Sequence, residues 1–174
     1  MAKVTGISCQ IITGDVDGAG TDGRVYLGIG GREFRLNSRE DDFERGSWRD
    51  YILGAGPPER ELSAPQLRVR NWESNDPTLR FPVDTDYLRR APVYVRFEPQ
   101  HAQDNWNLSF VAALVYADEF VVGYTPAENF HDLWLGQSMG KVLYLLNEWS
   151  DEQRLLERCR RAADWNSFNP PPRA

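Results

Sequence analysis

The 174-residue sequence has little cysteine, histidine and lysine, and these shortages exclude several classes of protein. Its two cysteines, Cys9 and Cys159, are too few for a disulfide framework, and their spacing is not that of a metal site. We interpret both as buried free thiols. Arginine supplies 18 of the 20 basic residues, yet the net charge is −6. An acidic chain of this kind lacks the basic surface expected of a nucleic-acid-binding protein.

Long apolar runs are also missing. No segment approaches the roughly 18 apolar residues that a membrane-spanning helix needs. The first ten residues, MAKVTGISCQ, lack the apolar region of a secretory signal peptide. We therefore expect no transmembrane segment and, by default, a cytoplasmic location, although calcium is more abundant outside the cell.

Alternating apolar and polar residues recur along most of the chain. Val25, Leu27 and Ile29 alternate before a Gly30-Gly31 turn, and similar patterns cover residues 34–36, 67–69 and 93–97. Between residues 106 and 114, five alternate residues are predicted to share one face: Trp106, Leu108, Phe110, Ala112 and Leu114. Short strands separated by turns predict an all-β antiparallel sandwich in one domain, residues 1–148.

Two regions lie outside this strand pattern. Within the region of residues 54–90, residues 54–66 and 73–90 are rich in Pro, Glu and Asp and are predicted to form long surface loops. Residues 149–174 are predicted to form an appended C-terminal α-helix and a Pro-rich tail. Ser150 and Gln153 fit a capping box there. A narrow apolar stripe follows, and we expect it to pack on the sandwich, a dimer contact being the less favoured alternative. The stripe consists of Leu155, Leu156, Cys159 and Ala163.

Oxygen-bearing side chains are densest in two neighbouring segments, residues 15–23 and 40–44. Calcium takes six to eight oxygen ligands from carboxylates and backbone carbonyls in bent loops. The first segment does not fit an EF-hand, because its fifth, eighth and twelfth positions hold Ala19, Asp22 and Tyr26. Composition alone leaves a polar turn without an ion as an equal alternative.

The sequence resembles the PLAT (lipoxygenase-homology) family, which also occurs in polycystins and alpha-toxin-type phospholipases. The resemblance rests on GAGTD at residues 18–22, DFERG at residues 42–46 and DNW at residues 104–106, and it covers roughly residues 3–146. It implies an eight-stranded antiparallel β-sandwich that binds calcium and associates with membrane lipid or with another protein. Carried over by position, it implies a set of calcium ligands: Gly18, Gly20, Thr21, Asp22, Asp41, Asp42 and Glu44.

Members of this family that bind membranes expose aromatic or aliphatic side chains beside the calcium loops. Trp48 is the candidate for this contact, with Trp72 second, and core packing is the alternative for both. The resemblance thus implies a non-catalytic, calcium-gated binding module, for which we favour a monomer. The alternative is a calcium-independent protein-interaction domain that uses residues 54–90 or the C-terminal helix.

A remote alternative is a small serine hydrolase. Residues 136–140 match the G-x-S-x-G pattern, with Ser138 as nucleophile. The hydrolase fold that uses this pattern places its histidine after the serine, whereas His101 and His131 both precede Ser138. Because the parallel α/β pattern is also missing, we interpret the match as coincidental.

Overall fold

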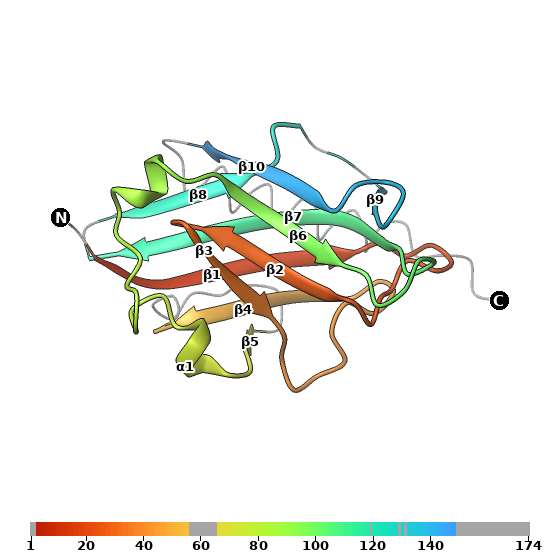
Figure 1. Ribbon diagram of the computed structural model, residues 1–174, viewed down its shortest axis with the longest axis horizontal. Coiled ribbons are helices and arrows are strands. Elements are labelled where there is room, and N and C mark those ends of the chain that lie inside the picture. The colour runs from red at the N-terminus through yellow and green to blue at the C-terminus, as the bar shows by residue number, and fades with distance from the viewer. Residues whose placement is uncertain (1–2, 56–65, 119, 129, 131, 149–174) are drawn as a thin grey trace.

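The protein is a two-layered β-sandwich in a computed structural model (Figure 1). The structure describes residues 3–55, 66–118, 120–128, 130 and 132–148. Its strands are β1 (Val4–Thr13), β2 (Arg24–Ile29), β3 (Arg32–Leu36), β4 (Trp48–Gly54), β5 (Gln66–Arg68), β6 (Val93–Glu98), β7 (Trp106–Ala117), β8 (Val121–Thr125), β9 (Leu133–Leu135) and β10 (Val142–Glu148). The predicted all-β sandwich is confirmed. Ten strands occur in the described residues instead of eight, and β5 and β9 have only three residues each.

The two layers share strand β10. Its residues 142–145 pair with β6, and its residues 146–148 pair with β8. One layer has the order β3-β2-β6-β10, and the other has the order β10-β8-β7-β1-β4-β5, with β9 beside β7. Figure 1 shows β3, β2 and β6 in front of the second layer. All pairs are antiparallel except β4 and β5, which are parallel.

The predicted hairpin between β2 and β3 is present. Val25, Leu27 and Ile29 are buried, as their alternation indicates. Gly30 and Gly31 have φ values of 58° and 77°, in the left-handed region that a two-residue hairpin turn needs. Local sequence therefore determines this element, because both the turn and the buried face follow from adjacent residues.

Strand β7 differs from the prediction. Trp106 and Leu108 contribute to the main core, whereas Ala112 and Leu114 belong to a second apolar cluster. The pairing with β1 shifts between Leu108 and Phe110, which leaves one extra residue in β7. Such a β-bulge moves the following side chains to the opposite face of the sheet. The prediction that all five apolar residues share a face is therefore wrong.

The main core lies between the two layers, and large aromatic side chains fill the end where β1 finishes. Phe43 has its ring centroid 5.4 Å from both Tyr51 and Trp106. The indole nitrogen of Trp106 donates a hydrogen bond to the Thr13 hydroxyl over 3.1 Å, so the buried ring leaves no polar atom unpaired there. Aromatic burial of this size dominates the packing of a small domain.

The segment from residue 66 to residue 90 is not a plain loop. It contains β5 and two short helices, α1 (Trp72–Asn75) and η1 (Tyr87–Arg89). Asn75 attaches α1 to β3, because its side-chain oxygen accepts a hydrogen bond from the Arg35 amide over 2.9 Å. Residues 56–65 and the predicted C-terminal helix lie outside the described residues. In the part of the chain that the structure describes, no helix combines the length and hydropathy of a membrane span.

Candidate metal centre

Three loops meet at the end of the sandwich where β1 finishes (Figure 1). They are residues 14–23, 37–47 and 99–105, and we call this region the acidic end. The Thr21 amide donates to the Phe43 carbonyl over 3.2 Å, and the Gly46 amide donates to the Gly14 carbonyl over 3.0 Å. Main-chain hydrogen bonds therefore hold the first two loops side by side.

Phe43 anchors the second loop to the core. It is buried although Asp42 beside it is half-buried and Glu44 is exposed, and its φ is 63°. A bulky residue rarely adopts this left-handed conformation, and it persists only where surrounding contacts enforce it. The ring contacts described above supply that enforcement. With Phe43 directed inward, Asp41 and Glu44 are exposed on either side of it.

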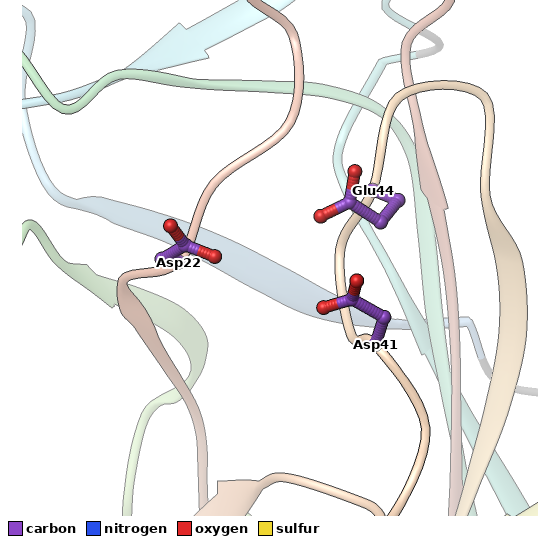
Figure 2. A group of neighbouring side chains, drawn as sticks. All are labelled: Asp22, Asp41 and Glu44. Carbon is purple, nitrogen blue, oxygen red and sulfur yellow. The ribbon is translucent and has the colours of Figure 1, made fainter.

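Three carboxylates gather between these two loops. Asp22 comes from the first loop, and Asp41 and Glu44 come from the second. One ligand atom from each lies within 4.8 Å of the other two. Figure 2 shows Asp22 facing Asp41 and Glu44 across the gap between the loops. All three are exposed, so a cation can reach them from solvent.

This arrangement suits a hard divalent cation. Three negative charges at such short range repel one another, and a cation between them would remove that repulsion. Calcium takes carboxylate oxygens in one- or two-oxygen mode and completes its shell with carbonyls and water. Within the described residues, the carbonyl oxygens of Gly20 and Thr21 accept no hydrogen bond and are available as further ligands.

Gly18, Gly20 and Thr21 shape the first loop. Gly18 has φ 73°, which favours glycine. A Cβ on Gly20 would lie 3.0 Å from the Arg45 amide nitrogen, so glycine allows the close approach of the two loops. The Thr21 hydroxyl accepts a hydrogen bond from the Gly23 amide and donates one to Asp104. Its side chain is thus engaged in loop structure, which leaves its carbonyl as the atom that can bind an ion.

Asp42 is not brought into the cluster. Its carboxylate accepts hydrogen bonds from the amide and the hydroxyl of Ser38, each over 2.7 Å, and from the Tyr51 hydroxyl over 3.0 Å. Burial and then the nearby Asp42 raise the pKa of Tyr51, which keeps this phenol protonated as a donor. Asp42 therefore closes the second loop, and we assign it no ligand role.

Sequence reasoning missed Arg45, which pairs with the other two acids of the first loop. Its guanidinium forms salt bridges with Asp15, over 2.7 Å, and with Asp17. Hydrogen bonding to Asp15 is the main reason why the pKa of Arg45 is raised. The only signal in the sequence was its place in the DFERG motif, between Glu44 and Gly46.

Asp104 was also missed as a functional residue, although it lies in the DNW motif. It is buried and accepts hydrogen bonds from the Thr21 hydroxyl, over 2.6 Å, and from the Gln100 amide, over 2.7 Å. The Gln100 side-chain amide in turn donates to the Asp22 carbonyl. The third loop therefore helps to fix the position of Asp22 through the Gln100 side chain.

The two tryptophans have different surroundings. Trp48 begins β4 opposite Ile12, next to the acidic end, and it is half-buried. Trp72 is 59% exposed but lies in α1, which contacts β3 and β4. Two apolar side chains that were not predicted to be exposed lie in or beside the acidic end. Val16 lies in the first loop, and Met139, 58% exposed, lies in the turn between β9 and β10, where Gly136 adjoins Asn105 of the third loop.

Ser138 lies in that same turn, where Gly136 and Gly140 pair as an isolated β-bridge. The turn joins two strands, whereas the nucleophile elbow joins a strand to a helix. His101 lies in the third loop and is exposed, and His131 lies outside the described residues. The G-x-S-x-G match thus lies in a turn between two strands and not in the strand-to-helix turn of a nucleophile elbow.

Known structures resemble this fold. Alpha toxin from Clostridium absonum matches 83% of this chain and 32% of its own, with 21% identity and a TM-score of 0.50. Coral 8R-lipoxygenase, described as activated by calcium through a C2-like domain, matches 94% of this chain with 13% identity and a TM-score of 0.46. No family model and no curated protein matches the sequence.

The predicted resemblance to PLAT domains is therefore confirmed as a resemblance of fold. The chain spans about a third of alpha toxin and about a fifth of the lipoxygenase. At these identities the likeness concerns architecture, and function has to be argued from the site itself.

Proposed function

We propose that this chain is a non-catalytic PLAT-like module that binds calcium at the acidic end and associates with membranes when calcium is bound. The observation that carries the proposal is the convergence of Asp22, Asp41 and Glu44 from two separate loops, one on each side of the β2–β3 hairpin. Three structural devices bring these carboxylates together: the buried Phe43, the close approach at Gly20, and the Asp104 network. Ordinary solvated acids need no such support.

The mechanism follows from charge and position. A bound calcium ion would offset two of the three negative charges of the cluster and tie the first loop to the second. The lower negative charge would let the acidic end approach an anionic lipid surface, because the repulsion between like charges falls. Val16 and Met139 are exposed at this end and can then enter the headgroup region.

The first experiment titrates the protein with calcium. Calorimetry measures the heat of binding, and thermal unfolding measures the change in melting temperature. A ligand that binds only the folded state stabilises it by about 2.7 kcal/mol when present at 100 times its Kd. We expect Asp22→Asn, Asp41→Asn and Glu44→Gln each to lose most of the calcium-induced rise. Without calcium, their melting temperatures should equal or exceed that of the wild type, because a repulsive charge is gone.

Two control variants separate binding from loop structure. Glu40 is exposed in the same loop but outside the cluster, so Glu40→Gln should keep the full calcium effect. Asp42→Asn should lower stability with and without calcium, because Asp42 accepts three hydrogen bonds. The proposal is wrong if millimolar calcium neither releases heat nor changes the melting temperature of the wild type.

A second candidate function is calcium-independent binding of a protein through residues 69–91. The observation that favours it is the exposure of four large hydrophobic side chains in this stretch: Trp72, Leu79, Phe81 and Tyr87. Exposed apolar side chains that gather in one region are typical of interaction surfaces. Association that survives complete removal of calcium by a chelator would support this candidate over the first.

A further inference from the structure

In one sheet of the sandwich, the adjacent middle strands β7, β1 and β4 are buried on both of their faces. Beyond the main core, the second cluster described above lies on the outer face of β7 and includes Ala112, Leu114 and Tyr116. Neighbouring strands continue this buried outer face, which also contains Ser8, Gln10, Ile12, Asp50 and Ile52. The register places Leu114 beside Ser8 and Ala112 beside Gln10, so the residues form one continuous patch. We call this patch the outer face.

A buried outer face of this kind requires another segment to pack against it. In antiparallel sandwiches the outer face of a sheet is normally solvated and polar. Within the described part of the chain, the layer β3-β2-β6 covers the opposite side, and α1 has its main contacts with β3 and β4 (Figure 1). Asp50 is the only carboxylic acid among the residues named for the patch, and burial raises its pKa to about 7.

We propose that the outer face is the docking surface for the C-terminal segment, residues 149–174, of the same chain. The pairing register brings the start of this segment close. Glu148 pairs with Gly123 in β8, and Gly123 pairs with Leu114 in β7. Two strand spacings, about 10 Å, therefore separate the end of β10 from the middle of the patch.

The predicted helix fits the patch in length and in chemistry. A helix over residues 150–163 would be about 21 Å long. On β7 the distance from Phe110 to Tyr116 is about 20 Å. The apolar stripe that begins at Leu155 would meet the apolar part of the patch. Residues 154–161 hold four arginines against one glutamate, a charge opposite to that of Asp50.

Composition favours this segment over the other stretch outside the described residues. Residues 56–65 contain three prolines and one leucine, so they offer few apolar side chains for burial. Residues 149–174 add two tryptophans and one phenylalanine to the apolar stripe. A second copy of the chain is the remaining occupant, and the experiment below distinguishes it.

The direct test uses the native thiol of Cys159 in the full-length chain. Ala112→Cys places a second thiol on the outer face, and dibromobimane joins two thiols that lie close together. Cys9 does not compete, because it is fully buried and faces the main core. We expect a link within one chain between residues 112 and 159, identified by peptide mass spectrometry. Arg35→Cys, in β3 of the other layer, should not give this link.

Each other outcome of the cross-linking overturns the proposal. A covalent dimer would assign the outer face to a second copy. A failure to link in the folded Ala112→Cys variant, when the same variant links in urea, would show that Cys159 lies elsewhere. Circular dichroism of both cysteine variants establishes that they are folded.

A second measurement leaves the sandwich unchanged. Leu156→Asp places a charge on the apolar stripe, and we expect trypsin to cleave within residues 154–161 about tenfold faster than in the wild type, because local opening exposes these arginines. Glu157→Gln, off the stripe, should leave the rate unchanged. Equal cleavage rates for Leu156→Asp and the wild type would overturn the proposal.

Discussion

The acidic end and the segment from residue 69 to residue 91 differ in what they expose. At the acidic end an aromatic residue, Phe43, is buried and carboxylates are exposed. In the segment, Phe81 is 78% exposed while main-chain carbonyls are held by Arg32. The first arrangement stabilises loops and displays charge, which suits an ion. The second displays apolar side chains, which suit a macromolecular surface.

The two regions also use arginine differently. Arg32 donates hydrogen bonds to the carbonyls of Ser74, Asp76, Leu79 and Phe81, all neutral main-chain groups. Arg45 pairs with the exposed carboxylates of Asp15 and Asp17. Several hydrogen bonds from one arginine to main-chain carbonyls restrict the conformation of the segment. Exposed ion pairs such as those of Arg45 are weakened by water and salt. We therefore expect the conformation of the segment to depend on its arginine more than the acidic end depends on Arg45.

The largest expected difference between the regions concerns their phenylalanines. Phe43→Ala would leave a cavity between Tyr51 and Trp106 and should lower the free energy of unfolding by about 3–5 kcal/mol. Phe81→Ala removes an exposed ring and should change the free energy of unfolding by no more than about 0.5 kcal/mol. Urea denaturation of both variants measures the contrast. Equal losses would mean that the two rings are equally buried in solution.

The arginines should give the next largest difference. Arg32→Ala should cost about 2 kcal/mol, because several carbonyls lose a charged donor. Arg32→Lys should not restore this stability, since a point charge cannot reproduce the planar fork. Arg45→Ala should cost less than about 1 kcal/mol, and the cost should shrink in high salt. A larger and salt-independent loss for Arg45→Ala would reverse the comparison.

The smallest effect concerns membrane contact. Met139→Ala should weaken calcium-dependent sedimentation with phosphatidylserine vesicles by about 1 kcal/mol, roughly fivefold, because part of one apolar side chain no longer enters the lipid. Trp72→Ala should leave this sedimentation unchanged, since α1 lies beside β3 and β4. If Trp72→Ala weakens binding more than Met139→Ala, the membrane contact belongs to the segment and not to the acidic end.

Much of the fold could be predicted because strand signals are local. The alternation at Val25, Leu27 and Ile29 and the glycine pair that follows determine a hairpin within ten residues. The bulge in β7 could not be predicted in this way. Nothing in the sequence around Ser109 marks an extra residue, because a bulge is defined by the partner strand.

The acidic residues of the candidate site could be predicted from the sequence, but not which of them lie together. The acids of both loops were identified from the sequence, yet Asp22, Asp41 and Glu44 meet while Asp42 turns to Ser38 and Tyr51. Adjacent acids in one loop have similar chemistry, and only their distant partners distinguish them. The exposure of Met139 likewise depends on how β9 places the turn that follows it.

Sequence alone determined that this protein is an all-β sandwich with an acidic loop region, because side-chain alternation, turn residues and charge are properties of neighbours along the chain. The tertiary structure decided which three carboxylates share one position, which arginine pairs with their neighbours, and that the middle strands of one sheet are buried on both faces. These features arise from contacts between residues tens of positions apart, such as Thr21 with Phe43 and Asp104. Such contacts exist only after the strands have paired and the core has closed around Phe43 and Trp106.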